Sequence, residues 1–234
     1  MKTIGLIGGM SWESSQTYYR LINQGVRDAL GGLHSARLVM YSVDFAEIET
    51  LQHQGDWEAT ATILAKAARA LEAAGADFMV LCTNTMHKVA EQIEQAVSIP
   101  LLHIADATAS VLKSAGVTSV GLLGTRFTME QAFYRDRLEQ QGIRVLIPDE
   151  SQRERVHGVI YDELCLGQIR DDSRQAYLDI VASLAERGAQ GVILGCTEIG
   201  LLIQATDTEI ALYDTTRIHA ERAVRVALTD KPAD

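Results

Sequence analysis

Two cysteines occupy the same local context in distant parts of the chain. Cys82 ends a hydrophobic run and is followed by Thr83-Asn84-Thr85, and Cys196 ends a second run and is followed by Thr197-Glu198. A thiol with its ordinary pKa of about 8.5 can donate or accept a proton near neutral pH. Two thiols that act on one carbon from opposite sides could remove a proton and return one. This symmetry suits a reaction that starts from either mirror-image form of its substrate.

Other kinds of thiol chemistry lack their usual partners in this sequence. Neither the Cys/His spacings typical of zinc sites nor a C-x-x-C redox pair is present. Acyl transfer by a single cysteine needs a histidine, and His87 is expected one turn into the helix that follows Cys82. Each cysteine taken singly could also be a small buried hydrophobe, which is the interpretation given to Cys165 in ELCLGQ.

Hydroxyl and amide groups near the two cysteines could hold a substrate carboxylate while charge builds on it. These candidates are Thr83, Asn84, Thr85, Thr125, Thr128 and Thr197. Each threonine could instead cap a turn or a helix, and a helix N-terminus is itself an anion site. Glu198 could pair with a substrate ammonium or lie solvated at a helix start.

The glycine-rich turn and the lysines give no sign of a cofactor. Residues 5–9 read Gly-Leu-Ile-Gly-Gly, which differs from the dinucleotide fingerprint G-x-G-x-x-G, and no P-loop is present. Pyridoxal phosphate requires a Schiff-base lysine, but the lysines lie at the termini or on helical stretches without a surrounding signature. We therefore expect no cofactor and no metal.

The elements that must position these residues alternate between short apolar runs and longer helical patterns, which predicts α/β architecture with mainly parallel sheets. The expected strands are residues 2–7, 36–43, 77–81, 101–104, 119–123, 144–147, 191–194 and 212–213. The expected helices are residues 14–30, 56–74, 86–96, 129–141, 172–187 and 218–228.

The pattern restarts halfway along the chain. IGLIGGM at residues 4–10 parallels VGLLGTR at residues 120–126, and Cys82-Thr83 parallels Cys196-Thr197 at nearly the same spacing. Such ordered matches indicate a duplicated unit. We expect two pseudo-symmetric lobes, each a mainly parallel sheet flanked by helices. The first comprises residues 1–103 plus 211–234, including a returning C-terminal helix, and the second comprises residues 104–210. Because ligands bind outside the carboxyl ends of parallel strands, the active site is expected in the cleft between the lobes.

The net charge of the chain indicates which kind of binding partner to expect. The chain has 234 residues with 21 basic and 31 acidic side chains, a net charge of −10. This balance disfavours nucleic acid or an anionic membrane as the main partner and leaves a small molecule. Three cysteines argue against a disulfide framework, and neither a signal peptide nor a long apolar span is evident. We expect a reduced, soluble, cytoplasmic protein.

Four motifs together identify a family. The segments IGLIGGMSWES, VLCTNTMHK, GTRFTM and GCTEIGLL resemble the aspartate/glutamate racemase family along essentially the whole chain. The resemblance implies two α/β lobes and racemisation without pyridoxal phosphate, with Cys82 and Cys196 as the two acid/base residues, and homodimers are common in the family. The positions that match the family's substrate-binding residues are Met10, Gln52, Thr83, Asn84, Thr85, Thr125, Thr128, Thr197 and Glu198.

One departure from the family pattern bears on the substrate. Members selective for aspartate hold its side chain with an arginine and a lysine, but the lysine position falls in residues 161–167, where Cys165 is the best match. Near Gln52 no clear arginine stands either. The sequence is therefore most similar to the broad-specificity amino-acid racemases, which implies a broad or neutral side-chain range. The alternatives are an aspartate/glutamate-specific racemase, a hydantoin racemase, a maleate isomerase, an arylmalonate decarboxylase or a catalytically silent amino-acid-binding protein.

Overall fold

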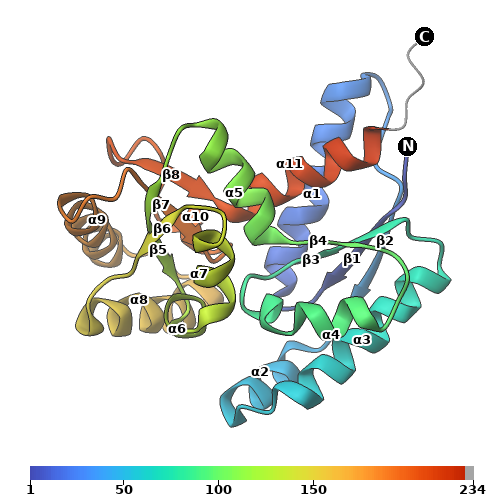
Figure 1. Cartoon of the computed structure of the whole chain (residues 1–234), viewed down its shortest axis with the longest axis horizontal. Coiled ribbons are helices and arrows are strands. Elements are labelled where there is room, and N and C mark those ends of the chain that lie inside the picture. The colour runs from blue at the N-terminus through green and yellow to red at the C-terminus, as the bar shows by residue number, and fades with distance from the viewer. Residues whose placement is uncertain (230–234) are drawn as a thin grey trace. The chain divides into compact units, whose positions relative to one another are not determined.

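The computed structural model describes residues 1–229, which form two compact units (Figure 1). Unit 1 comprises Met1–Ile104 together with the chain from His219, and unit 2 comprises Ala105–Ile218. Each unit holds a four-stranded sheet in which neighbouring strands run parallel. The predicted α/β class with parallel sheets flanked by helices is confirmed.

The sheet of unit 1 has the strand order β2-β1-β3-β4. Its strands are β1 (Ile4–Gly8), β2 (Leu38–Ser42), β3 (Phe78–Leu81) and β4 (Leu101–Leu102). The helical segments are α1 (Trp12–Leu30), α2 (Phe45–Gln54), α3 (Trp57–Ala73), the 3-10 helix η1 (Thr85–Val89) and α4 (Ala90–Gln95). Helix α5 (Ile104–Ser114) begins at the end of unit 1 and continues in unit 2.

Both faces of the first sheet are buried, which explains why β1 and β3 are continuous apolar runs. Alternate side chains point to opposite faces of a strand. Ile4 and Leu6 pack with α1 and with α11 (Thr215–Leu228), whereas Ile7 packs with α2, α3 and α4. Helices α1 and α11 also make a polar contact, in which the Tyr18 hydroxyl lies 2.9 Å from Nδ1 of His219.

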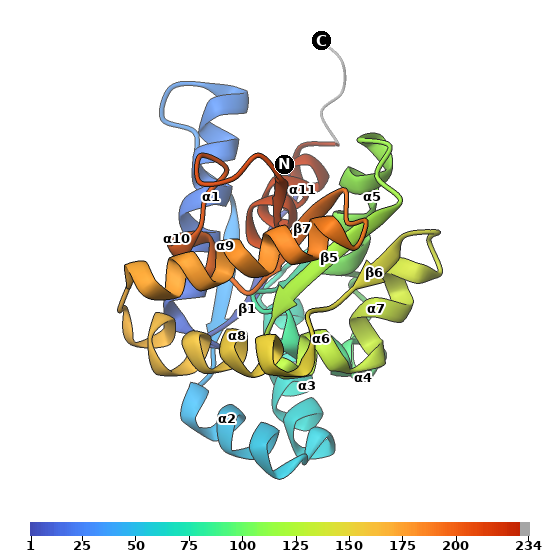
Figure 2. The ribbon, with the colours of Figure 1, turned by 90° about the vertical axis from the view of Figure 1, so that its left-hand side faces the viewer.

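The sheet of unit 2 repeats this topology with the order β6-β5-β7-β8. Its strands are β5 (Ser119–Gly124), β6 (Arg144–Leu146), β7 (Gly191–Gly195) and β8 (Ala211–Asp214). The helical segments are α6 (Arg126–Glu130), α7 (Ala132–Glu139), α8 (Glu150–Asp162), the 3-10 helix η2 (Leu164–Leu166), α9 (Asp171–Glu186) and α10 (Ile199–Leu202). Figure 2 shows α8 and α9 crossing the same side of the sheet, where α8 contacts β5 and α9 contacts β5 and β7.

Two expected helices are divided in the structure. The helix predicted over residues 86–96 consists of η1 followed by α4, and the helix predicted over residues 129–141 consists of α6 and α7. The second division occurs at Gln131, whose backbone is extended with φ −83° and ψ 150°. Helical periodicity alone did not reveal either interruption.

The chain returns to unit 1 later than predicted. Residues 211–214 were assigned to the first lobe, but they form β8, which pairs with β7 in the second sheet. The compact units divide inside α11, between Ile218 and His219. The part of the expected first lobe beyond residue 229 lies outside the described residues.

Candidate active site

Cys82 immediately follows β3, and two neighbouring elements fix its backbone. Its N–H donates to the carbonyl of Ile7 in β1 at 2.9 Å, and its carbonyl accepts from Oγ of Ser14 in α1 at 2.9 Å. The side chain is fully buried and belongs to the apolar cluster between the sheet, α1 and α11. Sγ lies 3.9 Å from the carbonyl of Val80. Burial raises the pKa of the Cys82 thiol well above its ordinary value.

The segment after Cys82 is held by an imidazole. The carbonyl of Thr83 lies 2.8 Å from Nδ1 of His87, and the N–H of Ile104 donates to Nε2 of His87 at 3.2 Å. A carbonyl can only accept and an amide N–H can only donate, so the proton is assigned to Nδ1 and the ring is neutral. His87 lies in η1, where both ring nitrogens engage backbone groups, so this geometry does not favour His87 as the base that activates a cysteine.

The other candidate residues of unit 1 lie at the carboxyl ends of its strands or on α2. Met10 follows the turn after β1, and Gln52 lies on α2. Asn84 directly precedes η1, and Thr85 is its first residue. All four side chains are buried. Thr83 is half-buried. Met10 shares an apolar cluster with residues of β3 and η1.

The glycine turn that leads to Met10 is tightly packed. Gly9 has a φ of +96°, and its N–H donates to Oγ of Ser15 at 2.8 Å. A Cβ added at Gly9 would overlap the backbone of Val43, so a side chain is excluded on steric as well as conformational grounds.

Cys196 immediately follows β7 and differs from Cys82 in its proton acceptor. Its Sγ donates a hydrogen bond to Oε2 of Glu198 at 2.9 Å. The thiol is half-buried and the Glu198 side chain is buried. Burial raises the pKa of Cys196 well above its ordinary value, and the negative charges of Glu198 and of an ionised Cys165 raise it further. The contact of Glu198 with a substrate ammonium stays a prediction, whereas a solvated position is wrong because the side chain is buried. In the structure Glu198 accepts a hydrogen bond from the Cys196 thiol.

Thr197 is connected to the start of α11. Its hydroxyl accepts from Oγ1 of Thr216 at 3.2 Å, and the N–H of Thr216 donates to Oδ1 of Asp214 at 2.9 Å. Thr215 donates through its hydroxyl to the carbonyl of Leu194 in β7 at 2.9 Å. The residues on either side of Cys196 are thus held by hydroxyl groups of α11.

Thr125 and Thr128 stand at the end of β5. Thr125 is the N-cap of α6 and accepts from the N–H of Thr128 at 3.4 Å, so it has the capping role considered for it. A Cβ at Gly195 would lie 3.4 Å from Cγ2 of Thr128, which shows that Thr128 packs against the end of β7. Unit 2 therefore brings Thr128 to the strand end that carries Cys196.

Several polar groups on α8, on α9 and at Glu163 were not foreseen from the sequence. Ser173 donates to Oε2 of the buried Glu163 at 2.6 Å, and Tyr177 donates to the carbonyl of Val156 at 2.8 Å. Burial raises the pKa of Tyr177, and the charges of Cys196 and Glu163 add to that shift. Cys165, interpreted as structural, is half-buried on η2 and close enough to influence the pKa of Cys196.

Residues 1–229 contain neither a metal-binding cluster nor a membrane-spanning helix. No group of three or more His, Cys, Asp or Glu side chains within this range is arranged to hold a metal ion. Within the same range, no helix combines the length and the apolar character needed to cross a bilayer.

Comparison with known proteins gives a consistent result. A family model described as Asp/Glu/hydantoin racemase matches residues 7–223. The broad specificity amino-acid racemase RacX of Bacillus subtilis (strain 168) is 28% identical over 161 residues, which cover 68% of each chain. A crystal structure from Yersinia pestis, provisionally described as an Asp/Glu racemase, has 57% identity and a TM-score of 0.92, with 97% of this chain and 100% of that chain covered. An aspartate racemase homologue from Pyrococcus horikoshii OT3 has 34% identity and a TM-score of 0.86, with 97% and 99% covered.

Proposed function

Because the chain belongs to the Asp/Glu/hydantoin racemase family, we propose that it is an amino-acid racemase that needs no pyridoxal phosphate or metal. In this proposal Cys82 and Cys196 are the two acid/base residues. The substrates are amino acids with neutral or varied side chains.

The observation that carries the proposal is the equivalent position of the two cysteines. Cys82 directly follows β3 and Cys196 directly follows β7, and these are the third strands of sheets with the same order. A duplicated scaffold that presents a thiol at the same strand end in each copy supports a reaction that is symmetric between two mirror-image substrates.

The proposed chemistry transfers two protons and breaks no other bond. The thiolate of one cysteine removes the proton from Cα, and the electron pair left on Cα delocalises into the substrate carboxylate. The thiol of the other cysteine then protonates the opposite face of Cα and becomes a thiolate. Thr83, Asn84, Thr85, Thr125, Thr128 and Thr197 are proposed to donate hydrogen bonds to the carboxylate as its charge increases, and Met10 and Gln52 are proposed to contact the substrate.

A thiol must lose its proton before it can act as the base. The hydrogen bond from Cys196 to Glu198 gives that proton an acceptor at 2.9 Å. We propose that Glu198 receives the proton of Cys196 when the thiolate forms. No equivalent carboxylate follows Cys82, because Asn84 stands two residues after it.

The substrate range is proposed from the charges near Cys196. The segment where aspartate-selective relatives are expected to carry a lysine holds Glu163 and Cys165 instead. A buried carboxylate near the site disfavours a second carboxylate on the substrate side chain. The description of the Bacillus subtilis relative as a broad specificity racemase agrees with this range. The Asp/Glu racemase and aspartate racemase descriptions of the Yersinia and Pyrococcus relatives favour an acidic substrate as the second candidate.

One exchange assay, repeated with five amino acids, tests the proposal. The purified protein would be held in D2O with a reductant and without pyridoxal phosphate, separately with L-homoserine, L-methionine, L-leucine, L-aspartate and L-glutamate. NMR would follow loss of the α-proton, and chiral chromatography would follow the D-form. We expect exchange with D-product for the neutral amino acids. Faster exchange of aspartate or glutamate would favour an acidic substrate, the second candidate. If none of the five amino acids exchanged its α-proton, the proposal that the protein racemises them would be rejected.

The assembly and location of the protein are also proposals. We infer a cytoplasmic homodimer from the family resemblance and from the composition. Light scattering coupled to gel filtration would give the mass in solution, to be compared with the 25.6 kDa of one chain. A monomer at micromolar concentration would contradict the dimer.

A further inference from the structure

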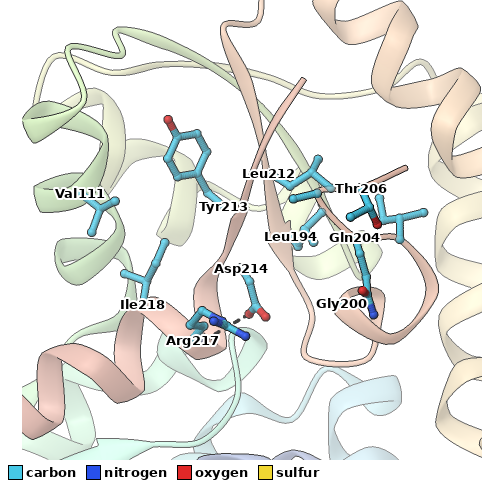
Figure 3. Close-up of a pocket in the computed structure, with 12 residues that line it drawn as sticks. Val111, Leu194, Gly200, Gln204, Thr206, Leu212, Tyr213, Asp214, Arg217 and Ile218 are labelled. Carbon is cyan, nitrogen blue, oxygen red and sulfur yellow. Dashed lines mark hydrogen bonds between the residues drawn. The ribbon is translucent and has the colours of Figure 1, made fainter. Parts of the chain in front are cut away.

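Unit 2 contains a pocket that the proposed reaction does not use (Figure 3). Its volume is about 500 Å³, which is in the range of about 300–1,000 Å³ typical of small-molecule sites. The walls come from α5, the end of β7, β8, α10 with the loop that follows it, and the first turn of α11. All of its lining residues belong to unit 2.

The pocket contains a carboxylate with one occupied and one open oxygen. Oδ1 of Asp214 accepts the N–H groups of Thr216 and Arg217 at 2.9 and 3.2 Å. Oδ2 has no hydrogen-bond or ion-pair partner among residues 1–229. Gly200 leaves this oxygen uncovered, since a Cβ at Gly200 would lie 3.2 Å from it. Burial raises the pKa of Asp214, and a cation bound at Oδ2 would oppose that effect.

An opposite charge lines the same pocket. The side chain of Arg217 is exposed and lies beside Asp214 in Figure 3. No ion pair of its guanidinium is found within the described part of the chain. The carboxylate of Asp214 and the guanidinium of Arg217, three residues apart in the sequence, match the separated charges of a small zwitterion.

The remaining wall is largely aliphatic. Val111 of α5, Leu212 of β8 and Ile218 of α11 line the pocket, and Figure 3 shows Val111 and Ile218 on the side away from Gly200 and Gln204. A ligand with an apolar body could bury it against these residues while its charged end meets Asp214 and Arg217.

We propose that this pocket is a second amino-acid site, which binds the zwitterion of an aliphatic amino acid. The ammonium group donates to Oδ2 of Asp214, the carboxylate pairs with Arg217, and the side chain packs against Val111, Leu212 and Ile218. Binding here requires neither cysteine, so the inference goes beyond the proposed racemisation.

The pocket is connected to Cys196 by hydrogen bonds. Asp214 accepts from the N–H of Thr216, and the hydroxyl of Thr216 donates to that of Thr197 at 3.2 Å. Thr197 is the residue directly after Cys196. A ligand that shifts Asp214 would therefore shift the segment that carries the second thiol, and this connection would couple the two sites.

NMR titration of the full-length, 15N-labelled protein with racemic leucine tests the proposal, because a racemic ligand undergoes no net turnover. We expect saturable shifts of the Gly200 and Thr206 amide signals. Asp214→Asn keeps the Oδ1 acceptor that caps α11 and removes the charge. It should weaken these shifts about tenfold to a hundredfold in apparent Kd. Gly200→Ala, which covers Oδ2, should weaken them in the same direction.

The control is Asp179→Asn, which removes an exposed carboxylate of α9 and should leave the affinity unchanged. Shifts that survive Asp214→Asn and Gly200→Ala with the same apparent Kd would overturn the assignment. So would the absence of any Gly200 or Thr206 shift up to the solubility limit of leucine. A protein that shows these shifts but exchanges no α-proton in D2O would reject the racemase proposal and keep the second site.

Discussion

Cys82 and Cys196 follow equivalent strands of two sheets with the same order, but their surroundings differ. The Cys82 thiol is fully buried, and its contact at 3.9 Å is to a backbone carbonyl. The Cys196 thiol is half-buried and donates to the carboxylate of Glu198 at 2.9 Å. The segment after Cys82 is held by the imidazole of His87, whereas the segment after Cys196 is held by the hydroxyl of Thr216.

The two units therefore share the positions of the thiols but not their acid/base environment. In the second unit the thiol proton has a carboxylate acceptor at hydrogen-bond distance, and in the first unit an amide side chain follows at the corresponding position. We infer that the two cysteines are unequal partners, with separate dependence on pH and on their neighbours.

The largest effect is expected from removing either thiol. Cys82→Ala and Cys196→Ala should each lower racemisation about a thousandfold, since each removes one of two general acid/base groups. Exchange of the α-proton in D2O should persist for one enantiomer in one variant and for the other enantiomer in the other. Cys165→Ala is the control and should lose no more than a few-fold. Full racemisation by either single variant would refute the two-base assignment.

The pH dependence should reflect the raised pKa values of both thiols. Below a raised pKa the thiolate is the minor form, and its fraction increases tenfold for each pH unit. We therefore expect kcat/KM for exchange to rise about a hundredfold between pH 6 and pH 8. Alkylation of Cys196 by iodoacetamide, followed by peptide mass spectrometry, should rise over the same range. A flat profile from pH 6 to pH 8 would contradict the assignment of a thiolate base.

The imidazole that holds the first segment should matter for stability. His87→Phe keeps a ring but leaves the carbonyl of Thr83 and the N–H of Ile104 without this partner, at a cost of about 2–4 kcal/mol. For a chain of this size we expect the melting temperature to fall by about 5–10 °C. His34→Phe, at an exposed position, is the matched control. An unchanged melting temperature for His87→Phe would show that these hydrogen bonds contribute little.

The smallest effect is expected from a variant that changes the reactivity of Cys196 but not that of Cys82. Glu198→Gln removes the charge that helps to raise the pKa of Cys196, so alkylation of Cys196 at pH 8 should become several-fold faster. Exchange of the enantiomer that Cys196 deprotonates should slow about tenfold, since the proton acceptor is lost. Alkylation of Cys82 should not change, and Glu150→Gln at an exposed position is the control. Equal effects on both thiols would remove the proposed asymmetry.

Most of the sheet architecture was predictable because the central strands β1, β3, β5 and β7 are almost entirely buried. The apolar runs that lead to Cys82 and Cys196 mark β3 and β7 directly, and the repeat predicts equivalent strand positions. The motifs around the cysteines also identified the family, which the match over residues 7–223 confirms.

Four α-helices were not predicted, namely α2, α5, α8 and α10. Two of them, α2 and α8, lack a strong apolar pattern. Helix α2 is bounded by Asp44, which caps its first turn, and by Gly55 in the left-handed conformation. Helix α8 begins with a capping box between Asp149 and Gln152. These end signals were present in the sequence and could have located both helices without a periodic stripe.

The details of the candidate site were less accessible because they depend on contacts between distant residues. His87 meets Ile104 across 17 positions, and Thr197 meets Thr216 across 19. The pocket around Asp214 combines residues from α5 with others near α11. Local motifs indicate which residues are reactive, whereas their partners depend on how the chain returns to the same place.

The return of α11 to unit 1 has a consequence for synthesis on the ribosome. Ala220, Ala223 and Ala227 of α11 complete the apolar cluster that covers Ile4, Leu6 and Tyr18. Helix α1 covers part of this face early, but the first sheet cannot complete its burial until residues 220–227 have been translated. Unit 2 is a continuous segment and can complete its core earlier. The growing chain thus exposes part of a hydrophobic face until residues 220–227 are translated. A chaperone bound at the ribosome would have its greatest effect on the yield of folded protein during that interval.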